Sequence, residues 1–276
     1  MTDIRAHRLL AAVEREFALT GARAVLLAGS RLERLDYPGA DIDFVALFDD
    51  PADIPAEIPH PGAVRMASTM GPSWIGHLDG QEVNVTVLSR PAVRRAATLL
   101  GRPLSPVCVP MLQPIEIVAL HRLGHGAPLT GAEYVAALLD DLHLARLPVA
   151  AFAVYHCSAA GHVRTAGALL DRDDLFGFEV MLLAAGVALG IATLCAYGRV
   201  GATMKKVATA LAALAAEHPD APLRPADLTA LAAGADPQAR LALAAAALDR
   251  SARMAQSRAP EDPLWAEARA AITARV

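Results

Sequence analysis

Aromatic residues are scarce in this chain of 276 residues: Phe, Trp and Tyr make up 4%, although hydrophobic residues make up 54%. Small and aliphatic side chains therefore carry the apolar content, a composition that favours closely packed helices. An excess of one charge sign is also lacking, because 25 Lys and Arg face 29 Asp and Glu, a formal net charge of −4. Without a general basic field, we do not expect a nucleic-acid partner.

Cysteine is nearly absent as well. The three cysteines, Cys108, Cys157 and Cys195, lie far apart and show no CxxC spacing. A disulfide framework and a zinc site are therefore not expected, and we predict buried free thiols in a reducing cytoplasm. The first residues, MTDIRAHRLL, carry charges where a secretory leader would be apolar, so no such leader is expected.

Long hydrophobic runs are limited to residues 180–197, which contain no charged side chain. One interpretation is a membrane-spanning helix, which needs roughly 20 apolar residues. The other is a helix buried on all sides in a helical domain, and the amphipathic character of the neighbouring segments favours it. We therefore expect no membrane contact, with Gly186 and Gly190 allowing neighbouring helices to approach closely.

The pattern along the chain changes near Pro91. Before it, we predict a helix at 3–20, strands at 22–29, 41–48, 73–78 and 81–88, a proline-rich loop at 49–62, and a hairpin turn at Asp79-Gly80. After it, segments with helical spacing are separated by prolines. The prediction is an α+β fold, with a mixed sheet and helices in domain 1–100 and an all-α domain in 101–276.

Two acids stand at alternate positions in an apolar strand, Asp41 and Asp43. Because side chains alternate along a strand, both carboxylates point to one face, while Ile42 and Phe44 point to the core. Like charges this close repel each other unless a cation lies between them. Carboxylates, waters and substrate phosphates are the ligands that Mg²⁺ prefers, so the pair predicts a magnesium site.

The preceding strand ends in Gly29-Ser30. A glycine at a strand end lets a ligand approach the backbone. The residues that follow can begin a short helix whose free N–H groups favour an anion. Together with the two acids, this turn predicts a triphosphate site with its cation.

The stretch AGSRLERLDYPGADIDF, residues 28–44, resembles the motif of the DNA polymerase beta-type nucleotidyltransferase superfamily. The small-molecule members of that superfamily include the aminoglycoside and lincosamide nucleotidyltransferases. They join a palm-like mixed-sheet catalytic domain to a helical domain, in agreement with the two predicted domains. The resemblance therefore implies a catalytic domain at 1–100 and a helical substrate-binding domain at 101–276.

The same resemblance implies roles for single residues. Gly29, Ser30 and Arg31 would contact the nucleotide phosphates, and Asp41 and Asp43 would hold Mg²⁺.

The superfamily places a third carboxylate between hydrophobic residues on a neighbouring strand, where this chain has QEVNVTVL at 81–88. Glu82 and Asn84 both fit that position. Glu82 would complete a catalytic, metal-binding triad, whereas Asn84 would leave the third acid missing. We prefer Glu82 and keep Asn84 as the alternative.

Basic residues in the predicted helical domain form a second group. Arg199, Lys205 and Lys206 resemble the cluster with which related small-molecule enzymes contact the triphosphate. Ordinary capping of helix ends is an equally good interpretation. Glu133, Asp140 and Asp141 are candidates for a general base, although each also suits a solvated helix face.

The expected function is a cytoplasmic Mg²⁺-dependent nucleotidyltransferase that moves NMP from an NTP, expected to be ATP, to a hydroxyl of a small molecule and releases pyrophosphate. An antibiotic-like compound or a biosynthetic intermediate would be the acceptor. One alternative is transfer to tRNA or to a protein, and another is a degenerate module that binds nucleotide without catalysis. A homodimer is compatible with the sequence, which does not define the oligomeric state.

Overall fold

The structure is a computed structural model of the chain that describes residues 4–29, 32, 41–105, 112–201 and 204–273, with the side chains of residues 4–8 left out. The chain divides into two compact units. The sheet unit comprises Met1–Gly101 and Gln113–Leu144, and the helical unit comprises Arg102–Leu112 and Ala145–Val276. The predicted boundary after residue 100 differs from this division, because residues 113–144 return to the sheet unit.

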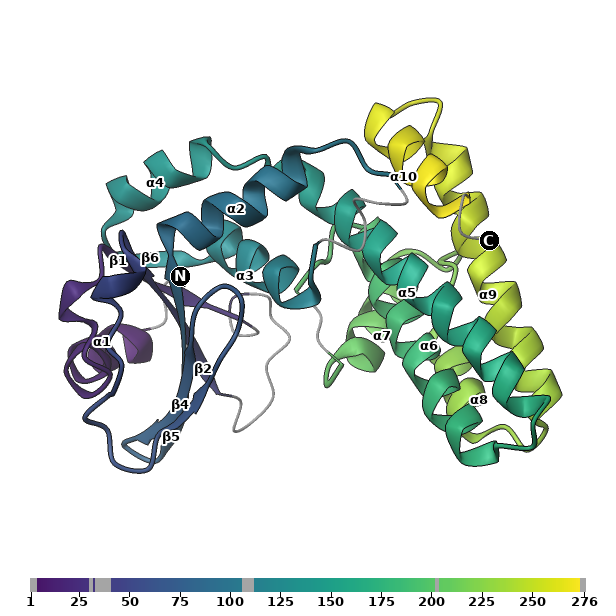
Figure 1. Cartoon of the computed structure of the whole chain (residues 1–276), viewed down its shortest axis with the longest axis horizontal. Helices are drawn as coiled ribbons and strands as arrows, with labels where there is room; N and C mark the ends of the chain where they lie inside the picture. Colours follow the sequence, from purple (N-terminus) through teal and green to yellow (C-terminus); the bar gives the residue numbers. More distant parts are fainter. Residues whose placement is uncertain (1–3, 30–31, 33–40, 106–111, 202–203, 274–276) are drawn as a thin grey trace. The chain divides into compact units, whose positions relative to one another are not determined.

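The sheet unit alternates helices with six strands (Figure 1). Its elements are α1 (Ile4–Glu16), η1 (Leu19–Gly21), β1 (Ala24–Ala28), β2 (Ile42–Phe48), η2 (Pro51–Asp53), β3 (Val64–Met66), β4 (Ser73–Leu78), β5 (Gln81–Ser89), α2 (Arg90–Gly101), α3 (Pro114–His125), β6 (Ala127–Thr130) and α4 (Ala132–Asp140). The sheet order is β3-β4-β5-β2-β1-β6. Among the strand pairs of the described residues, β2 and β5 are the one parallel pair, so the predicted mixed sheet is confirmed.

The alternation along β2 separates two faces of the sheet. Ile42 and Phe44 join a buried cluster with Val13 of α1 and with Phe17, the residue after α1, as the sequence predicts. Asp43 belongs to the opposite face, where Arg122 of α3 contacts it. In Figure 1, α1 lies on one side of the sheet, and α2 and α3 lie on the other. The apolar face of β2 thus anchors the strand in the core, and the opposite face, under α3, presents Asp43.

Two short strands of the sheet unit are absent from the sequence prediction. They are β3 and β6, and they form the two edges of the sheet. Helix α3 continues through Gly124 to His125. The imidazoles of His121 and His125 consequently lie on one helix with ring centroids 4.2 Å apart. The β4–β5 hairpin at Asp79-Gly80 is confirmed, with positive φ at both turn residues.

The helical unit is built around two long helices that are adjacent in the chain, α5 and α6 (Figure 1). Its elements are α5 (Leu147–Leu170), α6 (Leu175–Ala196), α7 (Val207–Glu217), α8 (Pro225–Ala233), α9 (Pro237–Arg258) and α10 (Pro263–Thr273), with η4 (Leu144–Arg146) at the unit boundary. Proline stands at the first or second position of α5, α8 and α9, as expected where an unpaired N–H would otherwise be left. The predicted helical C-terminal region is confirmed, but the range predicted as all-α, 101–276, also contains strand β6.

Helix α6 is the one helix in the described chain that is long and apolar enough to cross a membrane by length and composition, and half of its most apolar window is buried. Its second half lies in the core, as predicted, whereas Phe176 in its first turn is 82% exposed. A Cβ at Gly190 would lie 2.6 Å from Val207, and one at Gly186 would lie 3.3 Å from Leu231. The glycines therefore allow the close helix contact that the sequence suggested.

Candidate functional site

The site is centred on Asp43, in the middle of the sheet. On one side β1 runs antiparallel to β2 and pairs Ala28 with Asp43. On the other side β5 runs parallel and pairs Asn84 with Asp43. Gly29, directly after β1, and Asn84 on β5 thereby come to the two sides of one carboxylate.

The Asp43 carboxylate is 3% exposed and is held by donors from two elements. Arg122 Nη2 lies 2.9 Å from Asp43 Oδ1, and Asn84 Nδ2 donates to the same oxygen over 3.2 Å. Arg122 Nη1 also donates to Thr86 Oγ1 over 3.1 Å. A buried carboxylate is costly unless it is paired, and the guanidinium supplies the compensating charge.

Gly29 makes the close approach of β1 to this carboxylate possible. Its φ is +78°, in the region that favours glycine, and a Cβ there would lie 2.0 Å from Asp43 Oδ2. Any other residue would therefore push Asp43 away or strain the turn. The next two predicted phosphate contacts, Ser30 and Arg31, lie outside the described residues.

The two residues considered for the third acidic position have different surroundings. Asn84 is the strand partner of Asp43 and touches it, as described above. The Glu82 side chain is 45% exposed, and its carboxylate lies 4.0 Å from His77 Nε2 on β4. The position beside Asp43 is thus occupied by an amide, the alternative that the sequence left open, and Glu82 lies two residues away toward solvent.

The oxygen atoms around Asp43 show how far the residues fit a divalent cation. Asn84 Oδ1 is buried and has no hydrogen-bond partner. Asp41, the residue before β2, is half-buried. Carboxylate and amide oxygens suit Mg²⁺, so the chemistry of these three side chains fits a divalent cation, although Arg122 pairs with Asp43 in this structure. Among the described residues, no group of three His, Cys, Asp or Glu side chains is placed to hold a metal.

Arg122 is the site residue that sequence reasoning missed. Its signal is a single arginine within the otherwise largely apolar helical segment IEIVALHRL. Such a residue needs a carboxylate partner when its helix packs on a sheet. Only the fold reveals that the partner is Asp43, 79 positions earlier.

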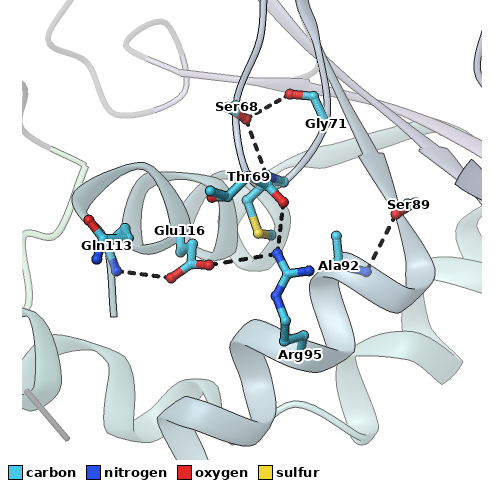
Figure 2. A network of polar contacts seen from close by, with 9 residues as sticks. Ser68, Thr69, Gly71, Ser89, Ala92, Arg95, Gln113 and Glu116 are labelled. Atoms are coloured by element: carbon cyan, nitrogen blue, oxygen red, sulfur yellow. Dashed lines mark hydrogen bonds and ion pairs between the residues drawn. The ribbon is translucent and has the colours of Figure 1, made fainter. Parts of the chain in front are cut away.

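The start of α3, the helix that carries Arg122, is fastened by the polar network in Figure 2. The Glu116 carboxylate accepts a hydrogen bond from Gln113 N over 2.9 Å, and Arg95 Nη2 lies 3.9 Å from its other oxygen. Arg95 also donates to Thr69 O over 2.7 Å, which ties the β3–β4 loop to α2. A cavity of about 470 Å³ lies beside this network.

That cavity is separate from the Asp43 site. It is lined by Ser89, the last residue of β5, and by Arg65 and Arg95. Ser89 lies five residues along β5 from Asn84, which corresponds to about 17 Å at the rise of a strand. The network in Figure 2 thus holds the start of α3 and does not include Asp43.

The opposite end of β2 carries another polar cluster. Tyr134 of α4 donates to Asp49 Oδ1 over 2.7 Å, and Arg23 Nε lies 3.2 Å from the second carboxylate oxygen. Burial, followed by the hydrogen bond to Asp49, raises the pKa of Tyr134 to about 12. The tyrosine therefore stays protonated at neutral pH and attaches α4 to the sheet.

The predicted basic cluster belongs to the helical unit. Arg199 Nη2 lies 2.6 Å from a carboxylate oxygen of Glu217 on α7. Lys205 is exposed and Lys206 is half-buried, just before α7 begins. The contact of these three residues with nucleotide phosphates stays a prediction, because the phosphates are expected at Gly29, which belongs to the sheet unit.

The general-base candidates lie at the surface of the sheet unit. Glu133 and Asp140 are exposed on α4, and Asp141 forms an exposed ion pair with Arg94 over 2.8 Å. None of the contacts described above joins them to Asp43. A solvated helix face describes these acids well.

Comparison with known proteins adds little to this geometry. No protein-family model matches the chain, and no curated protein matches it in sequence. Among solved structures it is similar to a nucleotidyltransferase-like protein from Exiguobacterium sibiricum, with 12% identity over 95% of this chain and 77% of that one, at a TM-score of 0.42. Similarity at this level carries no argument about function, which must rest on the site itself.

Proposed function

We propose that the chain is a nucleotidyltransferase that binds an NTP, expected to be ATP, in its sheet unit and, with Mg²⁺, moves NMP to a hydroxyl of a small acceptor. The observation that carries the proposal is the packing of Gly29 against Asp43. It brings a strand-end turn, suited to phosphate, next to a buried carboxylate, suited to a metal ion. The motif of residues 28–44 supports the same interpretation.

Each residue then has a defined task. Gly29 leaves room for phosphate at the backbone, with Ser30 and Arg31 following it. Asp41 and Asp43 would hold Mg²⁺, and Asn84 Oδ1 supplies a third oxygen in place of a carboxylate. Bound there, the ion would neutralise charge on the phosphate oxygens.

Arg122 sets a condition on this mechanism. Its guanidinium now neutralises Asp43, so it must release that oxygen before a cation can use it. Once released, a guanidinium suits phosphate oxygens. We therefore assign Arg122 a place beside the nucleotide phosphates.

The helical unit completes the proposal. It would supply the acceptor site, and Arg199, Lys205 and Lys206 would contact the triphosphate. An antibiotic-like compound or a biosynthetic intermediate remains the proposed acceptor class, because the charge balance gives no support for nucleic acid.

The test is transfer of label from α-labelled NTPs to a panel of hydroxylated acceptors in the presence of Mg²⁺. Asp43→Asn should lower transfer at least a hundredfold, because it removes charge from a metal ligand without changing its size. Glu57→Gln is the matched control: Glu57 is an exposed acid in the proline-rich loop, and its variant should keep wild-type activity. Transfer that survives Asp43→Asn would overturn the proposal.

A second candidate function is nucleotide binding without turnover. It is favoured by Asn84 in place of an acid and by Arg122 on Asp43. In that case the arginine, rather than a metal ion, would attract the phosphates, and nucleotide affinity would be equal in Mg²⁺ and in EDTA.

Asn84→Asp separates the two functions, because it restores a third carboxylate beside Asp43. In a slow enzyme, this variant should increase transfer tenfold or more. In a binding module with no other catalytic group, transfer should stay absent, and Arg122→Gln should weaken nucleotide binding. Glu82→Gln is the control for a ligand role of Glu82, and little effect is expected because that side chain lies toward solvent.

A further inference from the structure

The helical unit contains a cavity of about 440 Å³ between α5, α9 and α10. Most of its walls are apolar, and they include Val163, Leu248, Ala252 and Ile272. Small-molecule sites in proteins have volumes of roughly 300–1,000 Å³ and mainly apolar walls with a few placed polar groups. The volume and the lining therefore match a ligand site.

One polar side chain in this lining is buried and only half satisfied. His156 of α5 is 1% exposed, and its Nδ1 lies 3.1 Å from Ser251 Oγ on α9. Its Nε2 is buried without a hydrogen-bond partner. Buried polar atoms in native proteins are nearly always paired, so this nitrogen, on a side chain that lines the cavity, lacks the partner that a ligand hydroxyl would supply.

The protonation state of His156 narrows the ligand chemistry. Burial lowers the pKa of His156 to about 4, so the ring is neutral at pH 7. A neutral imidazole offers one donor and one acceptor nitrogen, and the geometry with Ser251 allows either arrangement. A ligand hydroxyl both donates and accepts, so it can pair with Nε2 in both tautomers.

The charges around the cavity agree with an uncharged ligand. Arg164 and Asp249 belong to the lining and have opposite signs. A charged ligand buried against the apolar walls would need an opposite charge, and a neutral histidine cannot supply one. Because Arg164 and Asp249 balance each other, the lining favours neither an anion nor a cation.

We propose that this cavity is a binding site for a small uncharged molecule with an apolar ring body and one hydroxyl group, which hydrogen-bonds to His156 Nε2. The site uses only residues of the helical unit, so the proposal is independent of nucleotide chemistry at Asp43. His156 orients the ligand, and the apolar walls supply the affinity.

The test compares 2-naphthol, naphthalene and 2-naphthoate by equilibrium dialysis against the full chain at pH 7. These probes share one ring body and differ in a hydroxyl, a hydrogen and a carboxylate. We expect saturable one-to-one binding of 2-naphthol, at least tenfold tighter than naphthalene. The carboxylate should bind most weakly.

Three variants locate the binding. His156→Phe keeps a ring but removes the nitrogens, and it should reduce the preference for 2-naphthol over naphthalene to less than twofold. Ala252→Leu fills the cavity and should weaken both probes tenfold or more. Ala212→Leu, at an exposed position of α7, is the matched control and should change neither.

Folding of each variant is checked by the emission of Trp265 in a Trp74→Phe background, since the Trp265 ring centroid lies 4.9 Å from Phe152 in this unit. His156→Gln keeps a polar atom, so it should retain part of the preference if His156→Phe disturbs the fold. No saturable binding, a preference that persists in both His156 variants, or binding unchanged by Ala252→Leu would overturn the proposal. Loss of binding in Ala252→Leu together with loss of preference in His156→Phe would support it.

Discussion

Asp43 in the sheet unit and His156 in the helical unit are both buried titratable side chains, but their surroundings differ. In the sheet unit, Asp43 is surrounded by donors from β5 and α3, and Arg122 neutralises its charge. In the helical unit, His156 has one partner, Ser251, and one buried nitrogen without a partner beside a cavity. The difference follows from charge. A buried carboxylate must find a cation, whereas a histidine can lose its proton and remain neutral.

This contrast indicates how each site would accept a ligand. At Asp43 a ligand must replace existing interactions, because Arg122 and Asn84 already occupy Oδ1. At His156 a ligand would add a hydrogen bond to Nε2, which has no partner. The sheet unit should therefore lose stability mainly when a substitution leaves the Asp43 charge unpaired. The helical unit should lose stability mainly when His156 is protonated or when the helix packing is disturbed.

Arg122→Met should have the largest effect. It leaves the Asp43 carboxylate buried without its cation, which costs about 3–5 kcal/mol of unfolding free energy. Urea unfolding can be followed for this unit alone by the fluorescence of Trp74, which is fully buried in the sheet unit, in a Trp265→Phe background. These are the only two tryptophans of the chain.

The double variant Arg122→Met/Asp43→Asn tests the cause. Since it removes both charges, it should recover most of the lost stability, and the coupling between the two positions should exceed about 1 kcal/mol. Additive effects would show that the guanidinium stabilises α3 by packing instead.

Acidification should reveal His156 in the helical unit. The pKa of His156 is lowered by burial from 6.5 to about 4, so between these values the unfolded chain binds a proton that the folded chain does not. Stability is therefore present above pH 6.5 and falls as the pH drops toward 4, by on the order of 3 kcal/mol.

The measurement is urea unfolding from pH 7 to pH 4, followed by Trp265 in a Trp74→Phe background. Carboxylates with lowered pKa values, such as Glu179 beside Arg240, also contribute stability that is lost as the pH falls over part of the same range. The difference between wild type and His156→Phe isolates the histidine. An equal pH slope in both proteins would contradict the burial of His156.

Two glycines give a third comparison between the units. Gly29→Ala places a Cβ 2.0 Å from Asp43 Oδ2 at a φ of +78°, and should cost about 2 kcal/mol through strain and displacement of the carboxylate. Gly190→Ala places a Cβ 2.6 Å from Val207 Cγ2, a side-chain atom that can shift, so about 1 kcal/mol is expected. Thermal unfolding compares the two, and the reverse order would show that α6 and α7 are more rigid than the turn.

The sequence predicts those parts of the fold whose signals are local. Strands β1, β2, β4 and β5 follow from apolar runs, and the β4–β5 hairpin follows from Asp79-Gly80. The alternation of Asp43 with Ile42 and Phe44 correctly gives the two faces of β2. The helical character of the second half follows from its composition and its prolines.

Long-range pairing was beyond the sequence. The choice between Glu82 and Asn84 depends on the register of β5 against β2, and that register pairs Asp43 with a residue 41 positions further along the chain, for which there is no local signal. The edge strands β3 and β6 have only 3 and 4 residues, too few for an alternation signal, so their pairing partners define them. Arg122 and His156 were found only when their neighbours from other elements were known.

The smallest effect is expected at an exposed ion pair that provides the counterpart to Arg122. Arg94 lies 2.8 Å from Asp141, almost the same distance as Arg122 from Asp43, but the two side chains are 51% and 55% exposed. Solvent and salt screen such a pair, so Arg94→Met should change the unfolding free energy by less than about 1 kcal/mol. The unfolding free energy is measured by Trp74 emission in the same background as for Arg122→Met. The two variants differ mainly in the burial of the carboxylate that each leaves behind. A loss equal to that of Arg122→Met would show that burial does not determine the strength of these pairs, and the contrast between the two sites would then need another cause.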